Sequence, residues 1–197
     1  MAGKVGIVFQ YPETQLFEQT VYDDIAFGPK NIHLNNIEER VKQAIEFVDI
    51  SEKLLKNSPF EISGGEQRKV AIAGVIAMEP EILVLDEPTV GLDPATKKSI
   101  LNKIKKYHET KQNTIIMVTH DIDIAAEFAS KILMLDNGKI VKYGSVEEVF
   151  SDIDTAIPEM TKIFRELKKI GFDVNTNIYT VKQAKQEILT CLNQNGK

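Results

Sequence analysis

The run Ile82-Leu83-Val84-Leu85-Asp86-Glu87 constrains the fold more than any other part of the 197-residue sequence. Its apolar residues are typical of a strand buried in a sheet, and the two carboxylates directly after them lie at the carboxyl end of that strand. Burying unpaired charge is costly, and ligands of open α/β sheets bind at this edge. The pair therefore predicts a site where one carboxylate holds a metal ion and the other orients or deprotonates water.

A simpler interpretation is that Asp86 and Glu87 form an exposed loop pair that caps the following segment. Pro88 and Gly91 give that segment a tight course, and Asp93 already provides a cap for the next helix. We therefore favour the ligand site.

The segments around this strand predict an α/β fold with a parallel sheet, because strand, helix and strand follow one another. The Asn137-Gly138 pair between two short apolar runs predicts a hairpin. Expected strands are 5–9, 82–85, 114–118, 132–135 and 140–143, and expected helices start at Asp93-Pro94 and around 122–128.

The remaining segments have helical periodicity. Asn36, with Glu39 three residues later, predicts an N-cap for a helix in a mostly helical middle stretch. Two amphipathic helices are expected near the end, one over 157–170 and one that begins at Thr180. We interpret them as an appended C-terminal unit.

Two further polar residues follow predicted strands. His120 stands just beyond 114–118 and should reach the same sheet edge as Glu87. From its spacing alone, a helix cap or a satisfied polar group explains it equally well. Gln10 leaves the first strand and could touch a metal ion or its water, although an ordinary turn residue would look the same.

Ser63-Gly64-Gly65-Glu66 begins a helix, and the serine and glutamate have the spacing of a capping box. The box does not explain adjacent glycines in the first turn, where each costs up to about 1 kcal/mol relative to alanine. Glycines there let a ligand approach bare backbone amides, so the segment also predicts a phosphate site.

Composition excludes several classes of protein. The formal charge of −5 and the sequence pI of about 5.3 give no basic footprint for nucleic acid. The single Cys191 cannot form an internal disulfide, which favours a reducing compartment. The apolar run 70–78 is far shorter than the roughly 20 residues that span a bilayer. We expect a cytosolic chain.

Together these residues resemble the nucleotide-binding subunits of ABC transporters. The similar motifs are the signature LSGGQ at 62–66, the Walker B strand at 82–87, the D-loop at 91–93, the Q-loop at Gln10 and the switch histidine at His120. Tyr11 to Phe17 and Tyr179 to Ala184 resemble the energy-coupling factor, or cobalt-type, branch, whose ATPase drives uptake of a vitamin or a transition-metal ion.

The resemblance implies an α/β fold, a P-loop NTPase (ABC ATPase) core that lacks its N-terminal strands, with a helical subdomain and a C-terminal helical extension. The expected ranges are 1–12 for the remnant of the core, 13–78 for the helical subdomain, 79–150 for the core and 151–197 for the extension.

Two departures from the family pattern matter. Glu66 replaces the signature glutamine, which keeps the glycines and the cap. The phosphate loop is missing, because the Gly-Lys pairs at 3–4, 138–139 and 196–197 are not followed by Ser or Thr. We therefore expect a truncated chain that has little or no ATPase activity alone.

The resemblance also implies roles for individual residues toward ATP and Mg²⁺. Asp86 would hold Mg²⁺ through water, Glu87 would polarise the attacking water, and Gln10 would sense the metal and the γ-phosphate. His120 would contact the γ-phosphate of the same nucleotide. Ser63, Gly64, Gly65 and Glu66 would face the nucleotide of the opposite subunit, and Asp93 would couple the two sites.

The implied partners are a second ABC ATPase, identical or different, a transmembrane coupling subunit and a substrate-binding membrane subunit at the cytoplasmic face of the membrane. The alternative is a non-catalytic module that lends its signature helix to a complete ATPase. An ABC ATPase acting on DNA would need a heptad-rich insertion or a basic face, and the sequence has neither.

Overall fold

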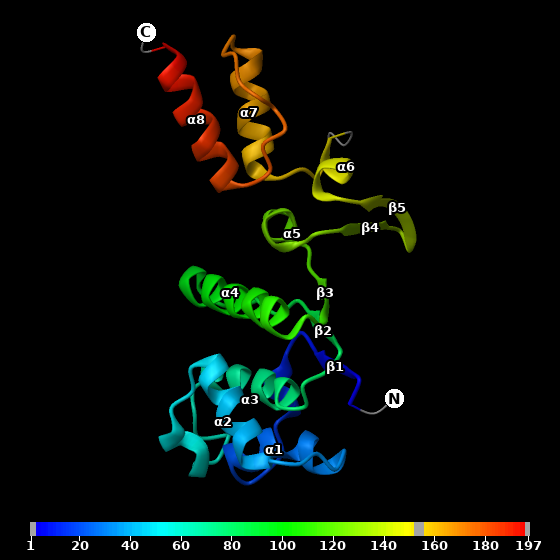
Figure 1. Cartoon of the computed structure of the whole chain (residues 1–197), viewed down its shortest axis with the longest axis vertical. Coiled ribbons are helices and arrows are strands. Elements are labelled where there is room, and N and C mark those ends of the chain that lie inside the picture. Colours follow the sequence, from blue (N-terminus) through cyan, green and yellow to red (C-terminus); the bar gives the residue numbers. More distant parts are fainter. Residues whose placement is uncertain (1–2, 152–155, 196–197) are drawn as a thin grey trace. The chain divides into compact units, whose positions relative to one another are not determined.

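Figure 1 shows the computed structural model of the chain, which describes residues 3–151 and 156–195. The chain divides into two compact units, residues 1–118 and 119–197. These units do not coincide with the four ranges predicted from the sequence, whose boundaries stay predictions. The predicted start of the C-terminal extension adjoins residues 152–155, which lie outside the described residues.

The first unit contains a parallel sheet in the order β1-β2-β3. Its strands are β1 (Val5–Val8), β2 (Ile82–Asp86) and β3 (Thr114–Val118). Val8 pairs with Leu85, and Asp86 pairs with Val118, so the three carboxyl ends meet at one edge. The parallel sheet predicted from the strand-helix-strand order is confirmed.

Helices before β2 form a compact bundle (Figure 1), in which α1, α2 and α3 contact one another and α3 also packs on β1. Their bounds are η1 Pro12–Gln15, α1 Val21–Asn31, α2 Ile37–Val48, η2 Glu52–Lys56 and α3 Gly64–Ile76. Apolar residues from all three long helices are buried in the same core cluster as Leu83 and Leu85 of β2. The bundle is thereby fixed to the sheet.

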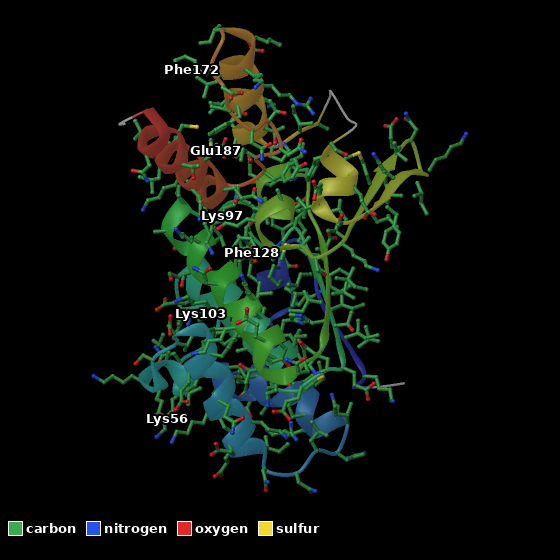
Figure 2. The ribbon with its side chains drawn as sticks, turned by 45° about the horizontal axis from the view of Figure 1, so that its top comes forward. Lys56, Lys97, Lys103, Phe128, Phe172 and Glu187 are labelled. Atoms are coloured by element: carbon green, nitrogen blue, oxygen red, sulfur yellow. The ribbon has the colours of Figure 1, made fainter. Side chains whose placement is uncertain are left out.

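The crossover from β2 to β3 is helix α4 (Pro94–Lys111), on which Figure 2 labels Lys97 and Lys103. It begins as predicted at Asp93-Pro94, where the Asp93 carboxylate accepts from the backbone N–H groups of Ala95 and Thr96 at 3.0 and 3.1 Å. Its apolar residues Ile100, Leu101 and Ile104 are buried.

Helix α2 begins directly after Asn36 as predicted, but the predicted side-chain cap is wrong. Asn36 lies in the left-handed region with φ 58°, and its side chain makes no cap hydrogen bond. Asparagine tolerates this conformation better than most residues, which explains its presence without a capping role. The side chain of Glu39 accepts instead from Gln43 Nε2 at 2.8 Å, one turn further along the helix.

The described residues of the second unit form a helix, a hairpin and three further helices. The elements are α5 Ile122–Phe128, β4 Ile132–Asp136, β5 Lys139–Gly144, α6 Val146–Phe150, α7 Glu159–Lys169 and α8 Val181–Asn195. The antiparallel hairpin turns at Asn137 and Gly138, with φ 46° and 73°, as the sequence predicts.

The two predicted C-terminal helices are present with one change of boundary. Helix α7 begins at Glu159, so Ile157 precedes it, because Pro158 takes the N-cap position. Helix α8 follows Thr180 as predicted, and Thr180 and Gln183 form a capping box with both hydrogen bonds present. Among residues 3–151 and 156–195, every helix is too short or too polar to cross a bilayer.

Candidate functional site

The carboxyl edge of the three-stranded sheet brings together three of the predicted site residues. Asp86 ends β2, and Glu87 follows it directly. Gln10 lies two residues beyond Val8, and Glu87 lies two residues beyond Leu85, which is the partner of Val8 in the parallel pair. The backbones of Gln10, Asp86 and Glu87 therefore leave neighbouring strands at the same edge of the sheet, where α/β proteins bind ligands.

Glu87 has an unusual backbone conformation at this edge. Its φ is 47°, in the left-handed region that few residues other than glycine adopt. The Glu87 N–H donates to the Val118 carbonyl at 3.0 Å, and the Glu87 carbonyl accepts from the Val90 N–H at 3.2 Å. Strained residues held by their surroundings are concentrated at functional sites, so this geometry is consistent with a ligand site.

The turn at residues 63–66, which we call the signature turn, begins helix α3. The Ser63 hydroxyl accepts from the Glu66 N–H at 3.3 Å, while the Glu66 carboxylate accepts from the Ser63 N–H at 2.9 Å and from the Ser63 hydroxyl at 2.6 Å. The hydroxyl, followed by the backbone N–H, holds the pKa of Glu66 below its ordinary value. Glu66 therefore satisfies the capping box that glutamine would also complete.

Neither the packing nor the backbone conformation of this chain requires glycine at the two glycine positions of the signature turn. A Cβ built on Gly64 or Gly65 would meet no atom within 4 Å, and neither residue has a positive φ. Both glycines are exposed. An open surface over backbone amides at a helix N-terminus fits an anion that approaches from outside this chain.

The segment of residues 88–93, which we call the D-loop segment, connects the acidic pair to α4. Gly91 has φ 76°, a conformation that glycine adopts without strain. The exposed Asp93 caps α4, and hydrogen bonds from Thr96, first from its side chain and then from its backbone N–H, lower the pKa of Asp93. Asp93 therefore has a structural function, and its proposed role toward a second subunit is additional.

His120 belongs to the second unit, two residues beyond the end of β3. Its side chain is exposed. Its approach to Glu87 stays a prediction, as do the roles of all the site residues toward a nucleotide.

Arg68 was not predicted from the sequence, although it contacts two of the segments described above. Its guanidinium donates to the Gln10 carbonyl at 3.1 Å, to the Glu13 carboxylate at 3.3 Å and to the Val90 carbonyl. The signal in the sequence was an arginine on the same helix face as Ile72 and Ile76, at spacings of four residues.

The residues at the sheet edge fit Mg²⁺ better than a metal held by protein alone. Within the described part of the chain, no group of three or more His, Cys, Asp or Glu side chains could hold a metal ion. Mg²⁺ usually keeps several waters and binds one or two carboxylates together with phosphate oxygens. Asp86 at the end of β2 supplies a carboxylate, and Gln10, which follows the neighbouring strand β1, supplies an amide oxygen. Together they are a donor set of that kind.

The fold and this edge define the class of protein. Residues 1–90 match the family model described as "ABC transporter". A solved structure described as cbiO1 from Clostridium perfringens, part of the ABC transporter complex cbiONQ, matches with a TM-score of 0.69 and 36% identity, over 85% of this chain and 64% of that chain. A dimeric bacterial ABC transporter cassette, MJ0796, matches with a TM-score of 0.65 and 28% identity, over 73% of this chain and 63% of that chain.

Similarity to curated relatives indicates which branch of the ABC transporter family the chain belongs to. The energy-coupling factor transporter ATP-binding protein EcfA2 of Clostridium tetani is 48% identical over 96% of this chain and 69% of its own length. EcfA2 of Clostridium perfringens is 44% identical over 98% of this chain and 71% of its own length. The chain belongs to the ABC ATPase family of the energy-coupling factor type, and its fold is that of an ABC cassette. It spans about two thirds of the length of these relatives.

Proposed function

We propose that the chain is an ATP-binding and ATP-hydrolysing subunit of an energy-coupling factor importer. The observation that carries the proposal is the meeting of Gln10, Asp86 and Glu87 at one edge of the parallel sheet. The identity to EcfA2 proteins supports the same function. In this proposal the imported solute is a transition-metal ion or a vitamin.

The residues at the sheet edge act on one nucleotide. Asp86 holds Mg²⁺ through water, and Gln10 contacts the metal or its water beside the γ-phosphate. Mg²⁺, when bound, neutralises charge on the phosphate oxygens. Glu87 accepts a hydrogen bond from the attacking water and polarises it, and the family resemblance implies that His120 contacts the γ-phosphate. These roles come from the family resemblance and from the positions of the strand ends.

The signature turn acts on the nucleotide of a second ATPase subunit. Ser63, Gly64 and Gly65 offer a hydroxyl and backbone amides to its γ-phosphate, over the surface that no atom of this chain fills. Glu66 maintains the cap that orients these amides, and Asp93 couples the two sites across the dimer. Binding of ATP closes such a dimer, and hydrolysis reopens it.

The importer would bind this chain at the cytoplasmic face of the membrane. A transmembrane coupling subunit and a substrate-binding membrane subunit complete the proposed assembly. Tyr11 directly follows Gln10, and the rings of Phe17 and Phe27 contact each other edge-on, with 4.7 Å between their centroids. All three aromatic side chains are exposed, which suits contact with a coupling subunit.

A second candidate function is a non-catalytic module that lends its signature turn to a complete ATPase. The exposed glycines of that turn suit this function, because no atom of this chain lies within 4 Å of a Cβ built on either of them. The 197 residues contain no glycine-rich loop ending in Lys and then Ser or Thr, so we expect these residues alone to release little phosphate from ATP.

Mixing the chain with a full-length EcfA2 relative distinguishes the two functions. The first measurement is ATP-dependent formation of mixed dimers by size-exclusion chromatography, and its absence would overturn both. The second is phosphate release by the mixture when the chain carries Glu87→Gln. A fall supports the ATPase function, and unchanged release supports the module. Glu81→Gln is the matched control, because Glu81 is exposed at the opposite end of β2 and pairs with Lys4.

A further inference from the structure

Arg68 connects three segments of the first unit through one guanidinium group. It lies in the second turn of α3, and only 5% of it is exposed. Nε donates to the Glu13 carboxylate at 3.3 Å, and one terminal nitrogen donates to the Gln10 carbonyl at 3.1 Å. The other terminal nitrogen donates to the Val90 carbonyl. Two of these acceptors lie in residues 10–15, which we call the Q-loop segment, and the third lies in the D-loop segment.

Burial of this charge is unusual in the chain. Among the described residues that are buried, Arg68 alone carries a full charge, and the other buried polar residues are Thr89, Asn113 and Thr161. A buried ion pair is often no more stabilising than apolar side chains of similar volume, whereas removing one partner is strongly destabilising. Stability alone therefore gives little reason for an arginine in this position. The arrangement of the hydrogen-bond donors of Arg68 explains the arginine better than stability does.

The guanidinium group suits this task because its donors diverge in a fixed plane. A lysine in the same place would present a single ammonium, which cannot reach acceptors in three directions with the same geometry. The acceptors are also specific, because two are backbone carbonyls whose positions depend on the course of their loops. Arg68 therefore fixes the paths of the Q-loop and D-loop segments relative to α3.

The signature turn begins the same helix one turn before Arg68. The capping box holds Ser63 and Glu66 together, so the first turns of α3 move as one body. We propose that Arg68 is a positioning residue that couples the signature turn to the Q-loop and D-loop segments of the same subunit. This inference rests on the proposed function of those segments at a nucleotide.

The coupling has a direct consequence for the geometry of the site. A shift of α3 when the signature turn meets its nucleotide moves the Gln10 carbonyl and the Val90 carbonyl together. Gln10 belongs to the site on the sheet edge, and the D-loop segment leads to Asp93. Arg68 thus connects the nucleotide at the signature turn with the positions of the Q-loop and D-loop segments, which contribute to the other nucleotide site.

Hydrogen exchange of the chain without nucleotide tests the positioning directly. Four loop amides are suitable reporters, because each donates to the carbonyl three residues before it: Thr14 and Leu16 in and directly after the Q-loop segment, and Val90 and Leu92 in the D-loop segment. A charged hydrogen bond changes a local opening equilibrium by about tenfold. In Arg68→Met we expect both pairs to exchange about tenfold faster, with amides of β2 and β3 unchanged.

Arg40→Met is the matched control. Arg40 also donates to one carboxylate, that of Glu79 at 3.0 Å, and to two backbone carbonyls, those of Asn35 and Ala77 at 3.0 and 3.4 Å. It should leave all four reporters unchanged. Faster exchange in only one segment, or equally faster exchange throughout the chain, would overturn the proposal.

A conservative variant keeps the test valid if Arg68→Met fails to fold. Arg68→Lys retains the charge and loses the divergent donors, so it should fold and protect at most one of the two segments. Glu13→Gln keeps a neutral acceptor at the third partner and should leave the D-loop reporters, Val90 and Leu92, protected. If Arg68→Lys protects both segments fully, the guanidinium geometry is not needed and the proposal fails.

A second measurement uses mixed dimers with a full-length EcfA2 relative. Arg68→Met should lower the kcat for phosphate release at least about tenfold while the KM for ATP stays within about twofold, because a positioning residue makes no contact with nucleotide. A rise in KM alone would contradict coupling. If the unsubstituted chain forms no ATP-dependent dimers, the proposed function fails, and the exchange experiment still decides whether Arg68 positions the loops.

Discussion

The backbone N–H of Glu87 donates to the carbonyl of Val118 at 3.0 Å, one residue beyond the last pair of the β2–β3 ladder. The bond extends the ladder past Asp86 while φ of Glu87 turns to 47°. The strand thus ends with a residue that is held on its neighbour and turned out of the extended conformation. The side chain proposed to polarise water is therefore carried by a fixed backbone.

The left-handed conformation of Glu87 predicts an unusual order of stability among its variants. An L-residue in this region costs roughly 1–2 kcal/mol, and glycine avoids most of that cost. We therefore expect Glu87→Gly to be about 1 kcal/mol more stable than Glu87→Ala by urea denaturation. Glu109→Gly and Glu109→Ala, in helix α4, should show the reverse order. Equal stability of the two Glu87 variants would contradict the strain.

The glycines of the signature turn predict opposite effects on stability and on pairing. Gly65→Ala places a methyl group where no atom lies within 4 Å, in the first turn of a helix. We expect the urea midpoint to stay equal or to rise, by up to about 1 kcal/mol of helix propensity. ATP-dependent pairing with a full-length relative should weaken, because the methyl group covers the amides.

The steric control for that substitution is Gly6→Ala. Its Cβ would lie 2.6 Å from a side-chain carbon of Val75 and 2.9 Å from one of Pro80, so the variant should be destabilised. Pairing that is unaffected by Gly65→Ala would show that the nucleotide does not approach over this surface.

Local signals in the sequence predicted the elements whose structure depends on neighbouring residues. The apolar run of β2, the cap at Asp93 and the Asn137-Gly138 turn each specify their own conformation, and all are confirmed. The common edge of Gln10 and Glu87 followed from one rule, that parallel strands end together. The position of His120 relative to that edge stays a prediction.

Other features depend on contacts between distant segments, which the sequence does not display. Arg68 contacts Gln10 and Val90, which are 58 and 22 residues away. Nothing next to Arg68 in the sequence indicates those partners. Asn36 shows the opposite difficulty, since its residue type suits both a cap and the left-handed conformation, and the structure adopts the second.

Two adjacent aspartates in α1 should give opposite dependences on pH. Burial raises the pKa of Asp24, whose carboxylate accepts from the N–H groups of Phe17 and Glu18. The hydrogen bond from Thr20 and then that from Lys30 lower the pKa of Asp23. A raised pKa means that the folded chain binds the proton more tightly, so the stability that Asp24 contributes falls as pH rises through its folded pKa. For Asp23 it rises with pH.

Urea denaturation between about pH 3 and pH 7 measures both effects as differences from variants. The stability of the unsubstituted chain relative to Asp24→Asn should fall as pH increases, whereas its stability relative to Asp23→Asn should rise. Slopes of the same sign for the two variants would contradict the environments described for these carboxyl groups.

The ion pairs of Glu79 predict a loss of stability in acid. Glu79 contacts Lys111 of α4 and Arg40 of α2, and its side chain is 37% exposed. The hydrogen bond from Lys111 is the main cause that lowers the pKa of Glu79 from 4.5. This stabilisation is present above the unfolded value and is lost as pH falls through the folded pKa. Because the pairs are partly solvated, we expect Glu79→Gln to cost only about 0.5–1 kcal/mol at pH 7, and less in 1 M salt. Lys111→Met should remove more of the acid dependence than Arg40→Met, and the reverse order in urea titrations at pH 4 and pH 7 would contradict the assignment.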